Sequence, residues 1–197
     1  MKLLDIFKIF GQKTTVNKED NYLPSFWEDD FCQIEIVPFE NREFIAKTIG
    51  QVNELTSNSN IDFGFTKIFA REQIPVTTFS KEIRTDYFHN LLISYEFEKA
   101  ESVLYDSQKT IECETGSTKA YGFHNFTIFF ETENEFVKNI WISVDLIVSK
   151  RQYDLIKSVL NSLGEECEML LVDWNVQELF DLTDKTQIDK YLNYHWK

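Results

Sequence analysis

The chain has 197 residues, of which 18 are Phe, 8 are Tyr and 4 are Trp, but only 6 are Gly and 3 are Pro. This length fits one domain with a substantial core, and the composition excludes a disordered chain and disfavours glycine-dependent nucleotide-binding loops. The formal net charge of −13 disfavours nucleic acid and anionic membranes as partners and favours basic proteins. Acidity that only keeps an aromatic-rich protein soluble explains the charge equally well.

The first segment, residues 1–23, is predicted to be an N-terminal arm made of a short amphipathic helix and a polar linker. Four apolar residues share one helical face: Leu3, Ile6, Phe7 and Phe10. This face is expected to pack against its own domain, although a membrane surface would also suit it. Asp5 and Lys8 interrupt the apolar run that a signal peptide needs, and no segment reaches transmembrane length. We therefore expect a cytoplasmic protein whose α+β domain covers residues 24–197.

The next segment has the pattern of a strand followed by a helix and a second strand. The letters FCQIEIV alternate apolar and polar residues, which predicts a strand near 31–37. Asn41 is a candidate cap for a helix over 41–57, which SNSN would end. The apolar run DFGFTKIFA predicts a returning strand at 62–70.

The middle of the chain predicts one helix and several antiparallel strands. A helix near 81–95 is expected to turn four side chains inward: Ile83, Tyr87, Leu91 and Leu92. Successive antiparallel strands are expected within 102–114, in the runs SVLYDS and TIECET, and further strands near 126–131 and 136–148. The polar letters ETENE predict the turn of a hairpin between the last two.

The last part of the chain repeats the strand–helix–strand order. Ser149 with Gln152 forms a capping box that begins a helix over 150–163, and Gly164 is expected to end it. The inner face of this helix is expected to contain Tyr153, Ile156, Leu160 and Leu163. A strand near 167–173 follows, then a capping signal at Asn175 with Glu178. Asp184 with Gln187 then begins a closing helix over 184–195, which presents Ile188, Tyr191, Leu192 and Trp196.

These elements predict a single α+β domain with a mixed, mostly antiparallel sheet and helices packed on one face. The three cysteines are Cys32, Cys113 and Cys167, an odd number without C-x-x-C spacing. Such cysteines are typical of buried free thiols in a reducing compartment.

The acidic triplet Glu28, Asp29 and Asp30 is the first candidate for a chemical site. A metal site needs converging ligands, whereas consecutive residues of an extended chain point in different directions, and no calcium-loop spacing is present. No paired His/Cys spacing, H-E-x-x-H motif or P-loop occurs elsewhere. We therefore expect no metal, no cofactor and no catalytic residues.

The histidines and one aspartate leave an enzyme as the alternative hypothesis. His89 and His195 fall in predicted helices, and His124 stands at the entry to a strand within AYGFHN. Asp173 lies at the carboxyl end of a predicted strand, where it could serve a catalyst or a helix entry. A hydrolase would combine Asp173, His124 and one carboxylate of residues 28–30.

Aromatic residues next to acidic ones point to a protein-binding surface. Trp27 and Phe31 flank the acidic triplet, and SYEFEKAES repeats the combination. Aromatic anchors supply contact area while surrounding charge steers a basic partner. The predicted partner-binding residues are Trp27, Glu28, Asp29, Asp30, Tyr95, Glu96 and Glu98. A Trp27 that only closes the core at the strand entry is the competing interpretation.

Two segments, LPSFWEDDFCQIEIVP and LGEECEMLLVDWNVQELFDL, resemble parts of small acidic Bacteroidetes-type cytoplasmic proteins. Some of these occur beside polymorphic or type VI secretion toxins and are regarded as immunity proteins. The resemblance implies a non-enzymatic inhibitor that sequesters a cognate, basic toxin domain. It assigns no individual residue. An uncharacterised regulatory or scaffold subunit remains the other alternative to an enzyme.

Overall fold

The computed structural model describes residues 22–57 and 73–196 and confirms a single α+β domain. The larger sheet has seven strands in the order β10-β9-β2-β8-β7-β6-β3, and each neighbouring pair is antiparallel. Its strands are β2 (Ile34–Pro38), β3 (Glu98–Lys99), β6 (Thr118–Phe123), β7 (Phe126–Glu133), β8 (Phe136–Val144), β9 (Met169–Asp173) and β10 (Glu178–Asp181). A smaller sheet, ordered β1-β4-β5, contains β1 (Ser25–Phe26), β4 (Ser102–Tyr105) and β5 (Lys109–Glu112).

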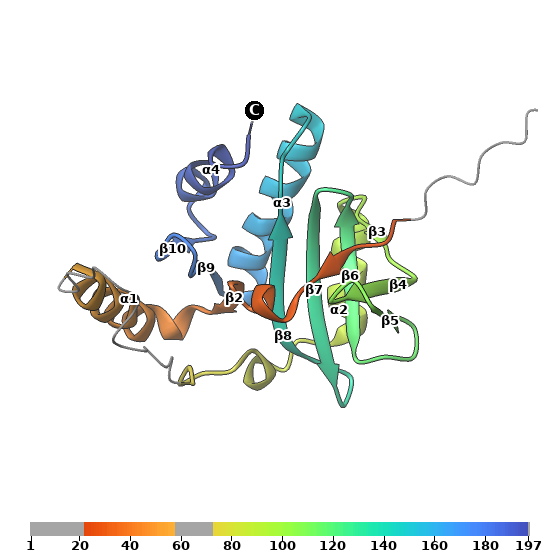
Figure 1. Cartoon of the computed structure of the whole chain (residues 1–197), viewed down its shortest axis with the longest axis horizontal. Helices are drawn as coiled ribbons and strands as arrows, with labels where there is room; N and C mark the ends of the chain where they lie inside the picture. The colour runs from red at the N-terminus through yellow and green to blue at the C-terminus, as the bar shows by residue number, and fades with distance from the viewer. Residues whose placement is uncertain (1–21, 58–72, 197) are drawn as a thin grey trace, which may run out of the picture.

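The helices lie on both sides of the larger sheet (Figure 1). They are α1 (Arg42–Ser57), α2 (Thr85–Ser94), α3 (Lys150–Cys167) and α4 (Lys185–Asn193). Helices α2, α3 and α4 share one core cluster, to which alternate residues of β2, β7, β8 and β9 contribute. The sequence predicted helices on one face of the sheet, and helix α1 is the exception. Its Ile45 packs against Val37, Leu170 and Val172 on the other face.

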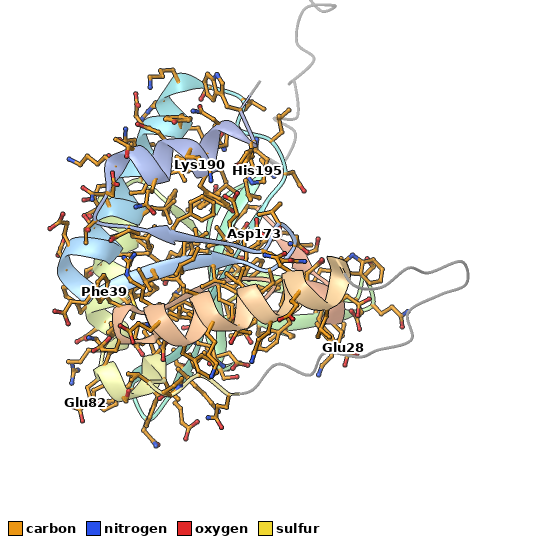
Figure 2. All side chains as sticks on the ribbon, turned by 90° about the vertical axis from the view of Figure 1, so that its left-hand side faces the viewer. Glu28, Phe39, Glu82, Asp173, Lys190 and His195 are labelled. Carbon is orange, nitrogen blue, oxygen red and sulfur yellow. The ribbon has the colours of Figure 1, made fainter. Side chains whose placement is uncertain are left out.

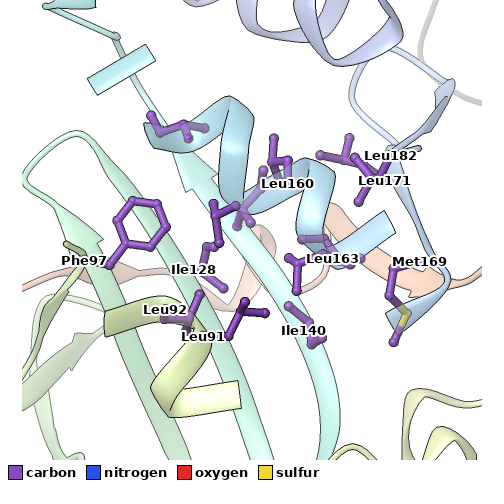
Figure 3. Close-up of a cluster of buried hydrophobic side chains, with 14 of the residues drawn as sticks. Leu91, Leu92, Phe97, Ile128, Ile140, Leu160, Leu163, Met169, Leu171 and Leu182 are labelled. Carbon is purple, nitrogen blue, oxygen red and sulfur yellow. The ribbon is translucent and has the colours of Figure 1, made fainter. Parts of the chain in front are cut away.

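The main core lies between α3 and the sheet. Figure 3 shows Leu160 and Leu163 of α3 beside Ile128 and Ile140 of the central strands. All four of these side chains are buried. The inner face predicted for this helix is confirmed, because residues three and four apart share one helical face.

The smaller sheet covers the opposite face of β6, β7 and β8. Its side chains Phe26 and Val103 are buried together with Phe129 and Trp141 of the larger sheet. The Phe129 and Trp141 rings stack with centroids 5.3 Å apart. Because successive residues of a strand face opposite sides, β7 and β8 supply both cores.

Local signals in the sequence predicted several connections correctly. Strands β7 and β8 pair as the expected hairpin, and the Ser149 side chain accepts a hydrogen bond from the Gln152 backbone at the start of α3. Asp184 caps α4 in the same way through the Thr186 nitrogen. Each of these features depends on residues that are close in sequence. Features of this kind can therefore be predicted from a single sequence.

Other expectations about single elements were wrong. The range 102–114 is not one of these, because the runs SVLYDS and TIECET predict successive strands and the structure forms β4 and β5 there, separated by a turn in which Asp106 and Ser107 have positive φ. Strand β6 was not predicted, and Asn175 belongs to the turn before strand β10 instead of capping a helix. Tyr87 is exposed, and Phe88 occupies the buried position in α2. The side chain of Asn41, which was predicted as a helix cap, exchanges two hydrogen bonds with the backbone of Val76.

Two predictions lie outside the described residues: the strand at 62–70 and the amphipathic face within residues 1–23. Within the parts of the chain that are described, no helix combines the length and the apolar character needed to span a bilayer.

Gly164 does not end α3, which continues to Cys167 and is closed by Glu168 in the left-handed conformation. The reason for a glycine here is close approach between elements. A Cβ at Gly164 would lie 2.3 Å from the carbonyl carbon of Leu182 and 2.6 Å from the nitrogen of Thr183. The segment before α4 therefore packs directly on the backbone of α3.

We predict opposite effects of alanine at two helical glycines. Gly164→Ala should lower the free energy of unfolding by about 1–3 kcal/mol, because a backbone must move to admit the methyl group. Gly50→Ala is the matched control, since a Cβ there meets nothing within 4 Å, and it should raise stability by up to about 1 kcal/mol. Urea denaturation of both variants measures the difference, and equal effects would contradict the close approach.

The three thiols are buried and free, as predicted. Burial raises the pKa of the Cys167 thiol to about 11 and also raises the pKa of Cys113. Both groups therefore remain protonated and weakly nucleophilic at neutral pH.

We predict that the native protein reacts slowly with a thiol-specific disulfide reagent at about pH 8 and that denaturant exposes all the thiols at once. The absorbance of the released thiolate measures both rates. Rapid labelling of Cys167 in the folded state would contradict its protection.

Candidate protein-binding surface

Residues Trp27–Phe31, here named the Trp27 platform, form an exposed turn on a rigid base. Strand β1 alternates, with Ser25 exposed and Phe26 buried, so the next side chain, Trp27, faces solvent. Trp27 is 51% exposed. This exposure contradicts the interpretation that Trp27 closes the core at the strand entry.

Hydrogen bonds close the platform onto itself and onto the β4–β5 turn. The Asp30 nitrogen donates to the Trp27 carbonyl over 3.0 Å, and the Trp27 nitrogen donates to Asp30 Oδ2 over 3.2 Å. The Glu28 nitrogen donates to Oδ1 of Asp106 over 2.9 Å. A segment distant in sequence thus holds the backbone of the platform next to Trp27.

Aromatic packing holds the platform from below. The ring of Phe31, 37% exposed, meets the buried ring of Trp141 edge-on with centroids 4.8 Å apart. Phe26 contacts the same indole at 5.4 Å. Large aromatic contacts of this kind stabilise a turn that otherwise has few buried atoms.

The platform carries uncompensated negative charge. Glu28, Asp29 and Asp30 are all exposed, and none of them has an ion-pair partner within residues 22–57 and 73–196. Burial raises the pKa of the neighbouring Tyr105 phenol, and the charges of Asp106 and Glu28 raise this pKa further. The exposed indole therefore stands in a local field that attracts cations.

The other predicted partner-binding residues do not join this surface. Tyr95 is half-buried against the α3-side core, and its hydroxyl lies 2.6 Å from Ser162 Oγ. Glu96 is ion-paired with Arg151 of α3. Glu98 is exposed in β3 at the end of the sheet. Tyr95 and Glu96 therefore lie on the α3 side of the sheet, and Trp27 to Asp30 form one continuous segment on the other side.

The hypothetical hydrolase residues are separated. His124 lies in the turn between β6 and β7, and strands β2 and β8 stand between β7 and β9, so His124 and Asp173 are about 14 Å apart across the sheet at a strand spacing of about 4.8 Å. His124 borders a cavity of about 610 Å³ whose lining contains neither Asp173 nor the acidic triplet. Asp173 is the register partner of Ile34, shortly after the acidic triplet, so the residue that stands apart is His124. In the part of the chain that is described, the three groups do not line one common cavity.

The Asp173 carboxylate instead stabilises a turn through hydrogen bonds. Its Oδ1 accepts hydrogen bonds from the nitrogens of Asn175 and Val176 at 2.9 and 3.4 Å, which closes the turn between β9 and β10. It also lies near the closing helix, beside His195 in Figure 2. Burial lowers the pKa of His195, and the charge of Asp173 opposes that shift. Among the residues described, no cluster of three or more His, Cys, Asp or Glu side chains could hold a metal ion.

Sequence reasoning missed Asp106 and Trp141, which position the platform. The runs SVLYDS and TIECET predict separate strands on either side of the turn at Asp106, but no local signal indicates that the Asp106 carboxylate accepts a hydrogen bond from the backbone of Glu28. Alternation along β8 places Trp141 on the face opposite Ile140 and Ile142, but no local signal indicates which element covers its indole.

Comparison of the chain with protein-family models, with curated proteins and with solved structures produced no match. The candidate site therefore depends on the geometry of this chain alone.

We predict that Trp27→Ala changes stability by less than about 1 kcal/mol, because half of the side chain is already exposed. The buried Trp141→Ala is the comparison, and it should cost about 3–5 kcal/mol. Thermal melts of both variants test this contrast. A large loss for Trp27→Ala would remove this residue from the list of binding candidates.

Proposed function

We propose that the protein is a non-enzymatic binding protein that acts as an immunity-type inhibitor and sequesters a cognate, basic toxin domain in the cytoplasm. The observation that carries this proposal is the exposed Trp27 indole, fixed on a rigid turn and surrounded by exposed carboxylates without ion-pair partners. The net charge of −13 agrees with a basic partner.

The two components of the platform suit different steps of binding. Exposed carboxylates attract a basic surface over about 8–10 Å at physiological salt, which speeds encounter. When an aromatic side chain enters a pocket of the partner, both the ring and the pocket wall are removed from water. This burial slows dissociation. Asp106 and Trp141 already hold the turn in place, so binding a partner requires little further ordering. The entropy cost of binding is therefore lower.

An inhibitor and a regulatory or scaffold subunit would use the same surface, so a functional test must separate them. The test is co-expression of this protein with the product of each adjacent gene that is toxic when expressed alone. We expect co-expression to restore growth. We also expect a stable complex, whose amount increases with the growth that is restored. Complex formation without rescue would favour a regulatory subunit, and absence of both would refute the proposal.

For the partner so identified, we predict separable kinetic effects. Neutralising the triplet by Glu28→Gln, Asp29→Asn and Asp30→Asn should slow association and flatten its salt dependence. Trp27→Ala should mainly speed dissociation, at a cost of about 2 kcal/mol or more. Surface plasmon resonance at several salt concentrations measures both rates.

The matched control for charge is the triple variant Glu43→Gln, Glu54→Gln and Glu165→Gln. These residues are exposed on α1 and α3, so the net charge changes equally without altering the platform. An equal decrease of the association rate in both triple variants would show that only the overall charge matters and that the platform is not the docking surface.

A further inference from the structure

A cavity of about 530 Å³ lies on the α2 face of the larger sheet, opposite the Trp27 platform. We name it the Lys99 pocket. Helix α2 contributes Thr85 and His89, β3 contributes Lys99, and β6 contributes Lys119 and Tyr121. The volume is that of a small-molecule site, and several polar groups converge on it from separate elements.

The pocket gathers positive charge in an acidic protein. Most lysines and arginines in the described parts of the chain are ion-paired with carboxylates. Lys99 has no such partner among the residues described, and the Lys119 ammonium donates to the backbone carbonyls of Cys113, Glu114 and Gly116. Neither lysine on the sheet side of the pocket therefore forms an ion pair among the described residues, although the charge of Glu114 acts on Lys119.

The two ammonium groups are close enough to affect each other. Burial lowers the pKa of Lys119, and the positive charge of Lys99 lowers it further. Like charges held together in a concave site are unfavourable. An anion placed between them would reverse the sign of this interaction.

Uncharged donors also line the pocket. Burial raises the pKa of Tyr121 to about 12, so its hydroxyl keeps its proton at neutral pH. That hydroxyl lies 2.6 Å from Nδ1 of His89, so the two side chains form a hydrogen-bonded pair at the wall of the pocket. The buried Thr85 hydroxyl has no hydrogen-bond partner within the described structure. A bound oxyanion could accept hydrogen bonds from such groups.

The mouth and the floor limit the kind of ligand. Arg84 stands at the mouth and is held by Asp86 through two hydrogen bonds of 3.0 and 3.1 Å, with Glu135 at 4.0 Å. These two carboxylates repel large polyanions such as nucleic acid. The floor contains the stacked rings of Tyr121 and Phe130, with centroids 5.8 Å apart, and it suits the apolar body of a small molecule.

We infer that the Lys99 pocket binds a small molecule with one carboxylate or phosphate head group, with Lys99 as its charge partner. This inference is independent of the proposed inhibitor function, because the pocket and the Trp27 platform lie on opposite faces of the sheet.

The test is a titration of the full chain with inorganic phosphate and, separately, with benzoate, at constant ionic strength. Two-dimensional NMR of backbone amides and histidine side chains reports binding. We expect saturable shifts at His89 and in β6 for at least one probe, and the probe that binds identifies the head group. Lys99→Gln should weaken binding roughly tenfold or more, as expected for loss of a charged hydrogen bond.

Lys109→Gln is the matched control, because Lys109 is exposed on β5 of the other sheet and its loss changes the net charge equally. It should leave the affinity unchanged. A second variant, His89→Gln, should weaken binding with no change in the folded spectrum elsewhere. Failure of both probes to shift these residues, or equal weakening by Lys99→Gln and Lys109→Gln, would overturn the assignment.

Discussion

Strand β8 must be covered on both faces, and the arrangement of the other elements follows from this requirement. Ile140 and Ile142 pack toward α3, while Trp141 between them packs toward the smaller sheet. A helix layer alone would leave the indole and Phe129 in water, and burial of large aromatic side chains is among the strongest contributions to a core. The β1-β4-β5 sheet supplies the missing cover, and in doing so it places the Trp27 platform.

Local patterns predicted the elements whose structure depends on neighbouring residues, such as the β7–β8 hairpin, the start of α3 and the inner face of that helix. Contacts between distant segments were beyond a single sequence. Gly164 looked like a helix end because glycine commonly ends helices, yet its role is to admit the backbone of Leu182. The turn before β10 looked like a helix entry, because Asp and Asn favour both structures.

The candidate site was predicted in part for the same reason. The combination of tryptophan and acids at 27–30 is a local property and forms one patch. The second predicted stretch, with Tyr95, Glu96 and Glu98, is separate in sequence, and the fold places Tyr95 and Glu96 on the α3 side of the sheet. Neither Lys99 nor Lys119 belongs to a motif, so the sequence alone does not identify them as binding residues. Only the pairing of β3 with β6 brings them together.

Phe129 and Phe130 are consecutive residues of β7, and they belong to different cores. One ring supports the base of the platform through Trp141, and the other forms the floor of the Lys99 pocket. Two ligands on opposite faces would not compete for space, so both can be bound at once. Any thermodynamic coupling between them would be reciprocal, and β7 contacts both sites through these two neighbouring rings.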